Sequence, residues 1–581
     1  MKKKIIAIIV LSVLAIILII IGGLLVGLLD VLVKFLVKQQ VPLKSGGFSE
    51  NLWANPPYDV RMQFWIYNLQ NPAQVTYGGA TPMYEELGPF TYKEIQKKRN
   101  VVFNDNGTVT YENHKWYVYV REESCAKCLP DATVTVPNIP YFTALNMIQS
   151  NAQLFPKETY IFSVIMEFLF GEEPFVRNVK VNDLLYEGYP DPLFGLLSTI
   201  TAFLGIPITG LKPKIALFYE KNGTADGVYN INTGTNDVYK VGQIEYWNFK
   251  KSLQFWNVSV EHPNEPGVSM GNDTISTAAS PLYPANFQAN MINGSDGTIY
   301  PPFVKKTDTL RMFVSDICRS VYAVSYEPEP DVVVKSIPGY RFSVPERVFN
   351  GTLVENSGFC YRQSDRYFKE KCSNESTYND DGCLMSGFLN ISYGPLTNCE
   401  RVNGTPGVPL VMSSPHFLYC PSCASDQLDI LDGNADAENY VTLLDIEPTT
   451  GVGLRFARKL QINIAMFSNP NIPNLKNFEP AIYPVAWLNE SATIDDHTAK
   501  SVYNKVILSK KLVVIGGWVL IALGIASILI VIILAVVLRY GLHPGMLRFG
   551  IRQPLDDDEQ PIITSLPNPN NIITLWSFRE F

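Results

Sequence analysis

The stretch IIAIIVLSVLAIILIIIGGLLVGLL, residues 5–29, contains no charged side chain, and neither does LVVIGGWVLIALGIASILIVIILAVVL, residues 512–538. A helix rises about 1.5 Å per residue, so each stretch is long enough to cross a hydrocarbon core of about 30 Å. The first stretch is too long for the apolar part of a cleaved signal peptide, and no small-residue cleavage site follows it. Both stretches are therefore predicted to be transmembrane helices.

The basic residues that flank the two spans predict their orientation. They are Lys2, Lys3 and Lys4 before the first span, and Arg539, Arg548 and Arg552 after the second. Short loops rich in Lys and Arg remain in the cytosol. We therefore expect a cytosolic N-terminus (1–4), a transmembrane helix (5–29), an extracytosolic domain (30–511), a second transmembrane helix (512–538) and a cytosolic tail (539–581). The glycines at 22, 23 and 27 permit close helix pairing, so a homo-oligomer is one arrangement to consider.

Ten Asn-X-Ser/Thr sequons agree with an extracytosolic domain, because all of them lie between the two spans. The predicted glycosylation sites are Asn106, Asn222, Asn257, Asn272, Asn293, Asn350, Asn374, Asn390, Asn403 and Asn489.

Charge and composition exclude several classes of protein. The 581 residues carry a formal net charge of −8, and 46% of them are hydrophobic. Most of the excess apolarity lies in the two spans, and residues 30–511 carry a net charge of about −10. A bundle of many membrane helices is therefore excluded, and nucleic acid is not expected as a partner because no basic surface would attract its phosphates.

All nine cysteines lie between the spans, at positions 125, 128, 318, 360, 372, 383, 399, 420 and 423. An extracytosolic compartment is oxidising, so disulfides are the expected state, and the odd number leaves at least one thiol without an intramolecular partner. The pairs Cys125-x-x-Cys128 and Cys420-x-x-Cys423 also have the spacing of zinc ligands. The oxidising compartment favours disulfides here, within or between the pairs, and no metal is expected.

Residue patterns predict strands early in this domain and helices after them. Residues 59–67 are rich in aromatic and β-branched types, residues 108–120 partly alternate, and Asp105-Asn106-Gly107 is a strong hairpin turn. From 141 to 170, apolar residues recur every three to four positions, which predicts two helices. They include Ala144, Leu145, Met147 and Ile148, then Phe162, Ile165, Met166, Leu169 and Phe170.

Several motifs in order resemble those of the class B scavenger receptor family, which includes the fatty-acid translocase and the lysosomal integral membrane protein type two. They are FWIYNLQNP (64–72), GPFTY (88–92), ALFYEKNGTADGVY (216–229), MINGSDGTIYPPF (291–303), SDICRS (315–320), SPHFL (414–418), LDIEPTTG (444–451) and WLNE (487–490). They cover almost the whole chain within the same arrangement of two spans.

The resemblance implies an α+β fold: an irregular antiparallel β-barrel with a helical-bundle apex at residues 141–205 and an internal lipid tunnel. It also implies disulfides Cys318–Cys399 and Cys360–Cys383, with Cys372 in an insertion and unpaired. Ligands enter at the apex in this family, which maps to Phe162, Ile165, Met166, Leu169, Phe170, Glu172 and Glu173. Because Glu172 and Glu173 make this position acidic, a cationic, neutral or sterol ligand fits its charge better than a free fatty acid.

Enzyme chemistry has little support. Gly-Val-Ser-Met-Gly at 267–271 matches a nucleophile elbow around Ser269, but Pro263 and Pro266 precede it and a sequon follows, where a strand and a helix are needed. No histidine stands in a metal-binding spacing, and His416 is expected to be a packed structural residue. We expect no catalytic residue and no cofactor.

The tail sequence DDDEQPII, residues 556–563, resembles an acidic dileucine sorting signal, with Asp558 four residues before Ile562 and Ile563. A solvated acidic tail is the alternative. The sequence thus predicts a receptor of the plasma membrane, lysosome or endosome that binds lipid or lipoprotein-like ligands at its apex and passes lipid to the membrane. The alternative is a sorting receptor that binds a protein cargo at the same apex.

Overall fold

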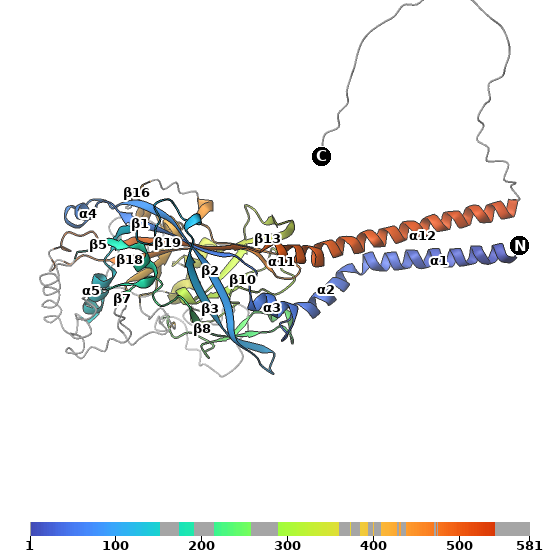
Figure 1. Cartoon of the computed structure of the whole chain (residues 1–581), viewed down its shortest axis with the longest axis horizontal. Coiled ribbons are helices and arrows are strands. Elements are labelled where there is room, and N and C mark those ends of the chain that lie inside the picture. Colours follow the sequence, from blue (N-terminus) through green and yellow to red (C-terminus); the bar gives the residue numbers. More distant parts are fainter. Residues whose placement is uncertain are drawn as a thin grey trace, which may run out of the picture. The chain divides into compact units, whose positions relative to one another are not determined.

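The computed structural model describes residues 2–151, 173–190, 214–256, 289–351, 353–359, 372, 384–392, 399, 408–426, 429–431, 437–469, 472 and 474–540. Helices and strands are mixed, with a long apolar helix toward each end of the chain (Figure 1). The chain divides into two compact units, Met1–Gly27 with Val514–Phe581, and Leu28–Val513. The expected α+β class and the two terminal membrane-type helices are confirmed.

The terminal unit contains α1 (Lys2–Gly27) and most of α12 (Ser509–Tyr540). Both helices are long and apolar enough to cross a membrane. They approach each other through small residues, since a Cβ atom added to Gly22 would lie 2.5 Å from the carbonyl oxygen of Gly517. A Cβ on Gly524 would likewise lie 2.8 Å from the carbonyl oxygen of Ala15. Close backbone packing at small residues is typical of membrane helix pairs.

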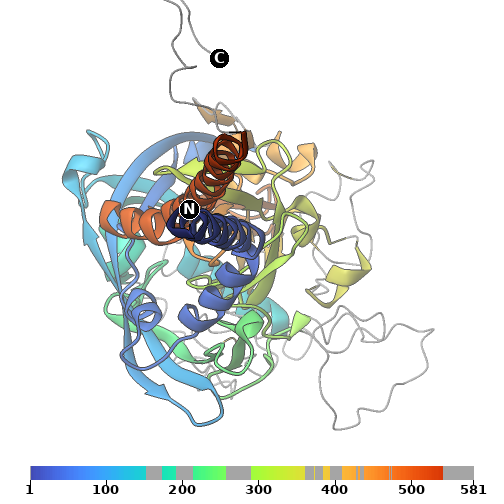
Figure 2. The ribbon, with the colours of Figure 1, turned by 90° about the vertical axis from the view of Figure 1, so that its right-hand side faces the viewer.

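The second unit is built on one large sheet whose neighbouring strands along its main path are antiparallel. In order, the path contains β10 (Leu310–Val314), β11 (Arg319–Ser325), β13 (Ile337–Ser343), β17 (Leu443–Ile446), β18 (Gly453–Met466), β19 (Ala481–Thr493), β1 (Val60–Leu69), β2 (Met83–Phe103), β3 (Thr108–Tyr119), β8 (Thr224–Asn232) and β9 (Ile244–Trp247). Figure 2 shows these strands curving around the middle of the unit.

Shorter elements complete the unit. Strands off the main path are β12 (Asp331–Val334), β14 (Leu389–Asn390), β15 (Leu410–Ser413) and β16 (Asp429–Leu431), and two small sheets pair β4 (Thr133–Pro137) with β5 (Phe175–Lys180) and β6 (Tyr189–Pro190) with β7 (Lys214–Ile215). Among the described residues of this unit, the α-helices are α2 (Leu29–Gln40), α3 (Phe48–Ala54), α4 (Pro72–Gly78), α5 (Ile139–Asn151), α10 (Ser422–Ser425) and α11 (Asp496–Val502). Short 3-10 or π turns are η1 (Arg121–Glu123), η2 (Asp183–Glu187), η3 (Val238–Lys240), η4 (Ser315–Ile317), η5 (Glu346–Phe349), η6 (Val354–Phe359), η7 (Pro415–Phe417), η8 (Ala437–Tyr440) and η9 (Tyr503–Leu508).

The two edge strands of the path, β9 and β10, are both hydrogen-bonded to one irregular segment. The Ile244 amide donates to the Gly294 carbonyl at 2.9 Å. The Ser295 amide donates to the Arg311 carbonyl at 3.1 Å, and the Phe313 amide to the Ser295 carbonyl at 2.9 Å. Gly294 has φ +94°, and a Cβ there would lie 2.1 Å from the Arg311 oxygen, so only glycine fits. The strands themselves do not close into a barrel, because β9 and β10 do not pair with each other.

The predicted strands and hairpin are confirmed. β1 covers most of residues 59–67, and β3 covers nearly all of 108–120. The hairpin registers Val102 with Thr110 and Phe103 with Val109 around the Asp105-Asn106-Gly107 turn. Gly107 has φ +82°, the left-handed conformation that this turn requires.

The expected helical apex at 141–205 is only partly helical in the described residues. Its beginning lies in α5, but residues 175–180 form strand β5, paired with β4. Phe175 and Val179 are the buried residues of this strand, and the residues between them show no regular alternation that would have predicted it. Leu184 and Leu185 are fully buried, so they belong to the core. Residues 152–172 and 191–205 lie outside the described residues.

Candidate ligand-binding site inside the sheet

Most residues of the predicted apex site lie outside the described residues, namely Phe162, Ile165, Met166, Leu169, Phe170 and Glu172. Glu173 is described, and its carboxylate lies 3.9 Å from Arg177. Both side chains are about half exposed, so this ion pair adds little stability. The tail residues Asp558, Ile562 and Ile563, and Ser269 of the nucleophile-elbow match, also lie outside the described part.

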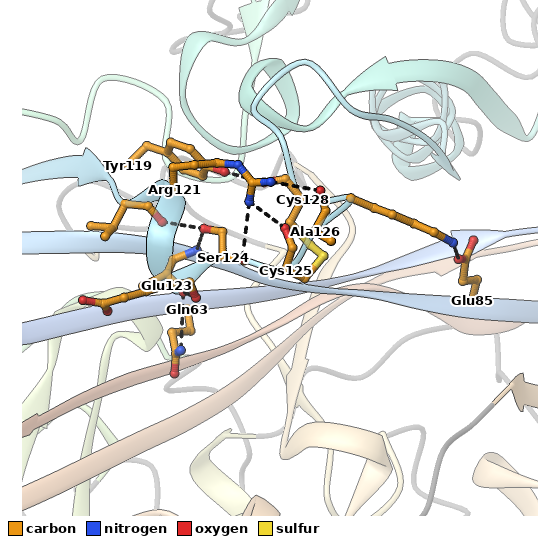
Figure 3. Close-up of a disulfide and its surroundings, with 12 residues drawn as sticks. Gln63, Glu85, Tyr119, Arg121, Glu123, Ser124, Cys125, Ala126 and Cys128 are labelled. Atoms are coloured by element: carbon orange, nitrogen blue, oxygen red, sulfur yellow. Dashed lines mark hydrogen bonds and ion pairs between the residues drawn. A yellow bond between two sulfur atoms is a disulfide. The ribbon is translucent and has the colours of Figure 1, made fainter.

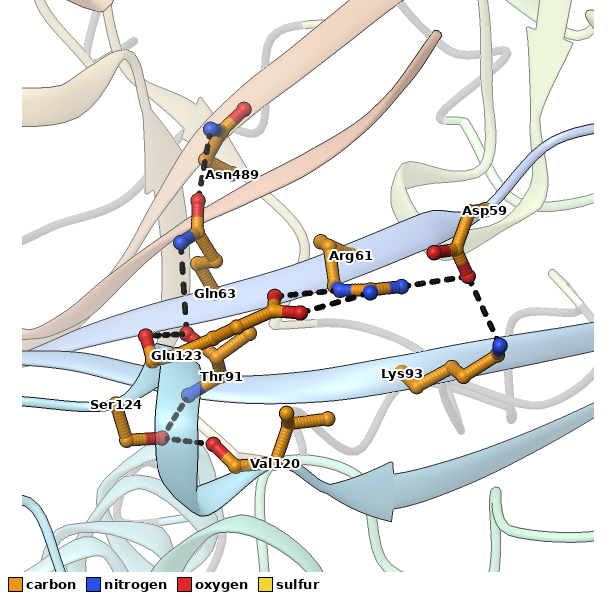
Figure 4. Close-up of polar contacts among 9 residues, drawn as sticks. All are labelled: Asp59, Arg61, Gln63, Thr91, Lys93, Val120, Glu123, Ser124 and Asn489. Atoms are coloured by element: carbon orange, nitrogen blue, oxygen red, sulfur yellow. Dashed lines mark hydrogen bonds and ion pairs between the residues drawn. The ribbon is translucent and has the colours of Figure 1, made fainter. Parts of the chain in front are cut away.

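Strands β1 and β2 carry polar side chains on both faces of the sheet, because alternate side chains point to opposite faces. On the outer face, Arg61 contacts Asp59 at 2.7 Å and Glu123 at 2.5 Å, and Lys93 lies 3.0 Å from Asp59 (Figure 4). The Arg61 hydrogen bond is the largest cause that lowers the pKa of Asp59 to about 2. These contacts hold η1 against the sheet. The intervening residues Val60, Met62, Phe64, Tyr92 and Glu94 are buried on the other face.

The outer face also holds the loop of the first disulfide, Cys125–Cys128. Arg121 donates to the Cys125 carbonyl at 2.9 Å and to the Ala126 carbonyl at 3.1 Å, and the Tyr119 hydroxyl donates to the Cys128 carbonyl at 2.5 Å (Figure 3). Lys127 lies 3.6 Å from Glu85. Arg121 thereby satisfies the carbonyls of a tight loop that has no strand partner, which is a structural role.

The other cysteines only partly follow the expectations. Cys318 and Cys399 form a disulfide, which is the pair that the family resemblance implies. Cys372 was expected to be unpaired and this was wrong, because it forms a disulfide with Cys423. Pairing between such distant cysteines depends on the fold. Cys420 is the free cysteine among those described, and burial raises the pKa of its thiol well above the usual value. Cys360 and Cys383 lie outside the described residues.

A row of charged side chains crosses the inner face of the sheet. Arg458 on β18 pairs across the strands with Glu490 on β19. Lys115 on β3 contacts Glu94 on the neighbouring strand β2 at 3.2 Å, and it extends across β2 and β1 to contact Glu490 on β19 at 3.6 Å. Arg458 also lies 3.2 Å from Asp316 in η4, two residues before Cys318. We call Glu94, Lys115, Asp316, Arg458 and Glu490 the inner charged row.

The inner charged row has one more carboxylate than it has cations. Glu94 is the carboxylate that this excess negative charge affects most. Its side chain is fully buried, and one of its oxygens has no hydrogen-bond partner. Burial is the largest cause that raises the pKa of Glu94, and the charge of Glu490 adds to it. Glu490 behaves oppositely, because Arg458 and Lys115 outweigh its desolvation and lower its pKa. Glu94 is therefore the member of the row that most readily holds a proton.

Part of the inner charged row remains accessible to water. Arg458 keeps 29% and Asp316 37% of the side-chain surface accessible. Yet desolvation by surrounding protein is the largest single influence on the pKa of each. For Asp316 the charge of Arg458 reverses that influence and lowers the pKa, and for Arg458 the charges of Glu490 and Asp316 raise it. Arg458 and Asp316 thus combine a largely protein environment with remaining exposure to water.

An aromatic cluster lies beside the charged row on the same face. It contains Phe64, Tyr92, Tyr117, Tyr186 and Phe218, whose ring centroids are 4.9–6.3 Å apart in the contacting pairs. Tyr117 is the cross-strand partner of Glu94. The Tyr92 and Tyr186 hydroxyls are buried without a hydrogen-bond partner. Aromatic surface next to unpaired hydroxyls and a protonatable carboxyl suits an apolar molecule that carries a polar group.

Sequence reasoning missed the inner charged row. WLNE at 487–490 was noted as a motif, but no role was assigned to Glu490. A usable signal was the presence of charged residues at core-facing positions. Lys115 shares a strand face with Tyr117 and Tyr119, and Glu94 shares one with Tyr92 and Phe90, because each set is spaced by two residues. His416 is packed as expected, with its Nε2 2.7 Å from Glu86 and its ring stacked on Tyr440.

The six described sequon asparagines differ in exposure. Asn106 and Asn222 are exposed, Asn293, Asn350 and Asn489 are half-buried, and Asn390 is buried. The Asn390 side-chain oxygen accepts from the Ser392 amide and hydroxyl of its own sequon. A glycan at Asn390 would require this side chain to leave the core. Asn257, Asn272, Asn374 and Asn403 lie outside the described residues.

Comparison with known proteins identifies the family. The model of the CD36 family matches residues 12–535. Lysosome membrane protein 2 of Homo sapiens is 30% identical over 495 residues, covering 84% of this chain and 86% of that protein. Scavenger receptor class B member 1 of Sus scrofa is 26% identical over 517 residues, covering 88% and 86%. Relatives with these names support a role as a membrane receptor. The chain therefore belongs to the CD36 family.

Proposed function

We propose that this chain is a membrane receptor that binds lipid or a lipoprotein-like ligand and passes lipid through the interior of its sheet to the membrane. The observation that carries this proposal is the inner face itself, where the aromatic cluster and the inner charged row lie together. The hydroxyls of Tyr92 and Tyr186 are buried without a partner, and Arg458 and Asp316 keep accessible surface, so this face retains polar groups that a ligand could engage.

An interior route requires the sheet to enclose a space, and the edge contacts support this. The segment at Gly294 and Ser295 is hydrogen-bonded to β9 on one side and to β10 on the other. It thereby joins the two ends of the strand path without being a regular strand. We infer an irregular barrel whose last seam is this segment, with the lipid tunnel inside it. Disulfide Cys318–Cys399 lies two residues from Asp316 and ties down the same wall.

The polar groups inside select what can bind. Free fatty-acid carboxylates would meet Glu94, Asp316 and Glu490, and a buried like charge is costly. Neutral or sterol-like molecules, or lipids whose head groups pair with both signs, would avoid that cost and could use the Tyr92 and Tyr186 hydroxyls. This preference agrees with the acidic apex residues Glu172 and Glu173 of the predicted entry site.

Photolabelling of the purified full-length chain tests the interior route. A lipid analogue with a photoreactive acyl chain would be crosslinked in detergent micelles, and the adducts mapped by peptide mass spectrometry. We expect adducts on peptides that contain Tyr117, Tyr186 or Phe218, and competition by the unlabelled lipid. Adducts confined to residues 5–29 and 512–538 would show only membrane contact, and the proposal would be abandoned.

Two separate proposals concern the site where the ligand enters and the cellular membrane in which the protein is located. Glu172→Lys together with Glu173→Lys should change the ligand preference if the apex is the entrance.

Ile562→Ala with Ile563→Ala should move the protein from lysosomes or endosomes to the cell surface if the tail is a sorting signal, and an unchanged distribution would exclude that role. The similarity to a lysosome membrane protein favours this sorting, and it keeps a receptor for protein cargo as the alternative function.

A further inference from the structure

Helix α2 (Leu29–Gln40) has three distinct faces, although it is only twelve residues long. Val33 and Val37 pack against the core of the second unit. Asp30, Lys34 and Lys38 follow one another every four residues and are exposed. The third face consists of large apolar side chains that remain exposed, namely Val31 (64%), Leu32 (43%), Phe35 (59%) and Leu36 (49%), preceded by Leu28 (52%). We call these five residues the apolar stripe.

This exposure is unusual for the second unit. Among the described residues, no other α-helix that lies wholly within Leu28–Val513 exposes more than one large apolar side chain. The spacing of Leu28, Val31, Leu32, Phe35 and Leu36 is that of one continuous helical face. Such a face in water would promote association, so it is expected to be covered.

Chain connectivity indicates what covers the apolar stripe. The candidate membrane span runs from Ile5 to Gly27, and Leu28 is the next residue. A peptide bond places successive Cα atoms about 3.8 Å apart, so α2 must begin where the span leaves the hydrocarbon core. A helix of this length extends about 18 Å, and it can lie within the layer of lipid head groups.

Cationic and aromatic neighbours fit the same location. Lys34 and Lys38 flank the apolar stripe, where they can reach lipid phosphates while their stems remain apolar. The Lys38 ammonium lies 5.4 Å from the centre of the Tyr239 ring, and Tyr239 is itself 54% exposed. Tyrosine at the boundary between water and lipid is typical of membrane proteins, because its ring is apolar and its hydroxyl is polar.

We propose that α2 is an interfacial helix whose apolar stripe inserts into the extracytosolic leaflet of the membrane, with Lys34, Lys38 and Tyr239 at the head-group level. The helix thus fixes the second unit to the lipid surface at a second place besides the spans. The proposal depends on the first span crossing the membrane and does not depend on lipid passage through the sheet. The two ideas can therefore fail separately.

Site-specific photocrosslinking of the full-length chain tests this. Benzoylphenylalanine would replace Phe35 in proteoliposomes of phosphatidylcholine and phosphatidylserine that carry a tagged phosphatidylcholine. Val118 provides a matched control, because it is 53% exposed on β3 without any apolar stripe. We expect about tenfold more lipid adduct at position 35 than at position 118. Val31 serves as a second probe position if the first variant does not fold.

Two results would overturn the proposal. Lipid labelling at positions 35 and 31 no higher than at position 118 would show that the apolar stripe is not in the bilayer. Crosslinked dimers in place of lipid adducts would show that a second copy of the chain covers it. A lipid-depth measurement gives an independent check: a fluorescent side chain at position 35 should be quenched more by nitroxide lipids labelled near the head group than by those labelled near the end of the acyl chain.

Discussion

Two groups of buried charges lie on the same face of the β2–β3 hairpin, four residues apart on β2, and they are built differently. Lys98 and Asp296 form a closed pair at 3.2 Å, with 0% and 6% of their side chains exposed. Asp296 also accepts hydrogen bonds from Tyr111 and from the amide and hydroxyl of Thr298. The Lys98 ammonium faces the Trp53 and Tyr111 rings at 5.2 and 4.8 Å.

The inner charged row lacks this closure. It has three carboxylates for two cations, an unpaired oxygen on Glu94, and accessible surface on Arg458 and Asp316. A closed pair stabilises the fold and offers nothing to a ligand, since every polar atom is already engaged. An open group retains capacity to bind. Charge balance and hydrogen-bond satisfaction therefore separate the structural charges of this protein from its candidate functional ones.

The largest expected effect is on the closed pair. Lys98→Met would leave Asp296 buried without its cation, which costs about 3–5 kcal/mol of folding free energy. Chemical unfolding of the purified chain in detergent would measure this. Arg347→Met is the matched control, because its pair with Glu355 is exposed and is worth about 0–1 kcal/mol. Equal losses in the two variants would contradict the structural role of Lys98.

Two Tyr→Phe substitutions, each of which removes a single hydroxyl, test the difference between the closed pair and the region of the inner charged row. Tyr111→Phe removes a hydrogen bond to the Asp296 carboxylate and should cost about 1.5–3 kcal/mol. Tyr186→Phe removes a hydroxyl that has no partner in the protein, so the change should stay within about 0.5 kcal/mol. Tyr186→Phe should instead reduce photolabelling of the interior by lipid. A large loss of stability with unchanged labelling would assign Tyr186 to structure.

Arg458→Met tests the row itself. Glu490 and Asp316 would lose their shared cation, but water reaches this end of the row, so we expect a loss of about 1–3 kcal/mol, smaller than for Lys98. Arg458→Met combined with Glu490→Gln should recover part of the loss, because it removes one carboxylate together with one cation and so restores the original net charge of the row. Equilibrium unfolding of both variants decides this, and a double variant weaker than the single one would refute the charge-balance argument.

The smallest expected effect is on the pH dependence of folding stability, to which Glu94 and Asp296 should contribute with opposite signs. The pKa of Glu94 is raised in the folded protein, so its contribution to stability falls as the pH rises above about 4.5. Glu94→Gln should therefore gain stability relative to the original chain towards neutral pH. The pKa of Asp296 is lowered, because Lys98, Thr298 and Tyr111 outweigh its desolvation. Asp296→Asn should be less stable at neutral pH, and the deficit should shrink only as the pH falls through and below the usual pKa of about 3.8. Unfolding midpoints measured from neutral pH down to below this pKa would show parallel curves if the two groups were equivalent.

Much of the layout followed from local patterns. Two uncharged runs predicted the membrane-type helices, and an Asp-Asn-Gly turn between alternating segments predicted the β2–β3 hairpin. Prediction was wrong where partners are distant in sequence. Cys372 pairs with Cys423, 51 residues away, although the segment around it read as an insertion. Residues 175–180 form a strand because β4 offers them a pairing edge, which their own sequence does not reveal.

The sequence by itself determined the two apolar helices, the charge of the segment between them and the family, since length, hydropathy and ordered motifs are properties of the chain alone. Only the tertiary structure decided which charges meet. Lys115 and Glu490 are 375 positions apart, and they share a site because β3, β2, β1 and β19 lie side by side in this order. Desolvation and pairing depend on neighbours in space, so the difference between a closed charge pair and an open one exists only in the folded protein.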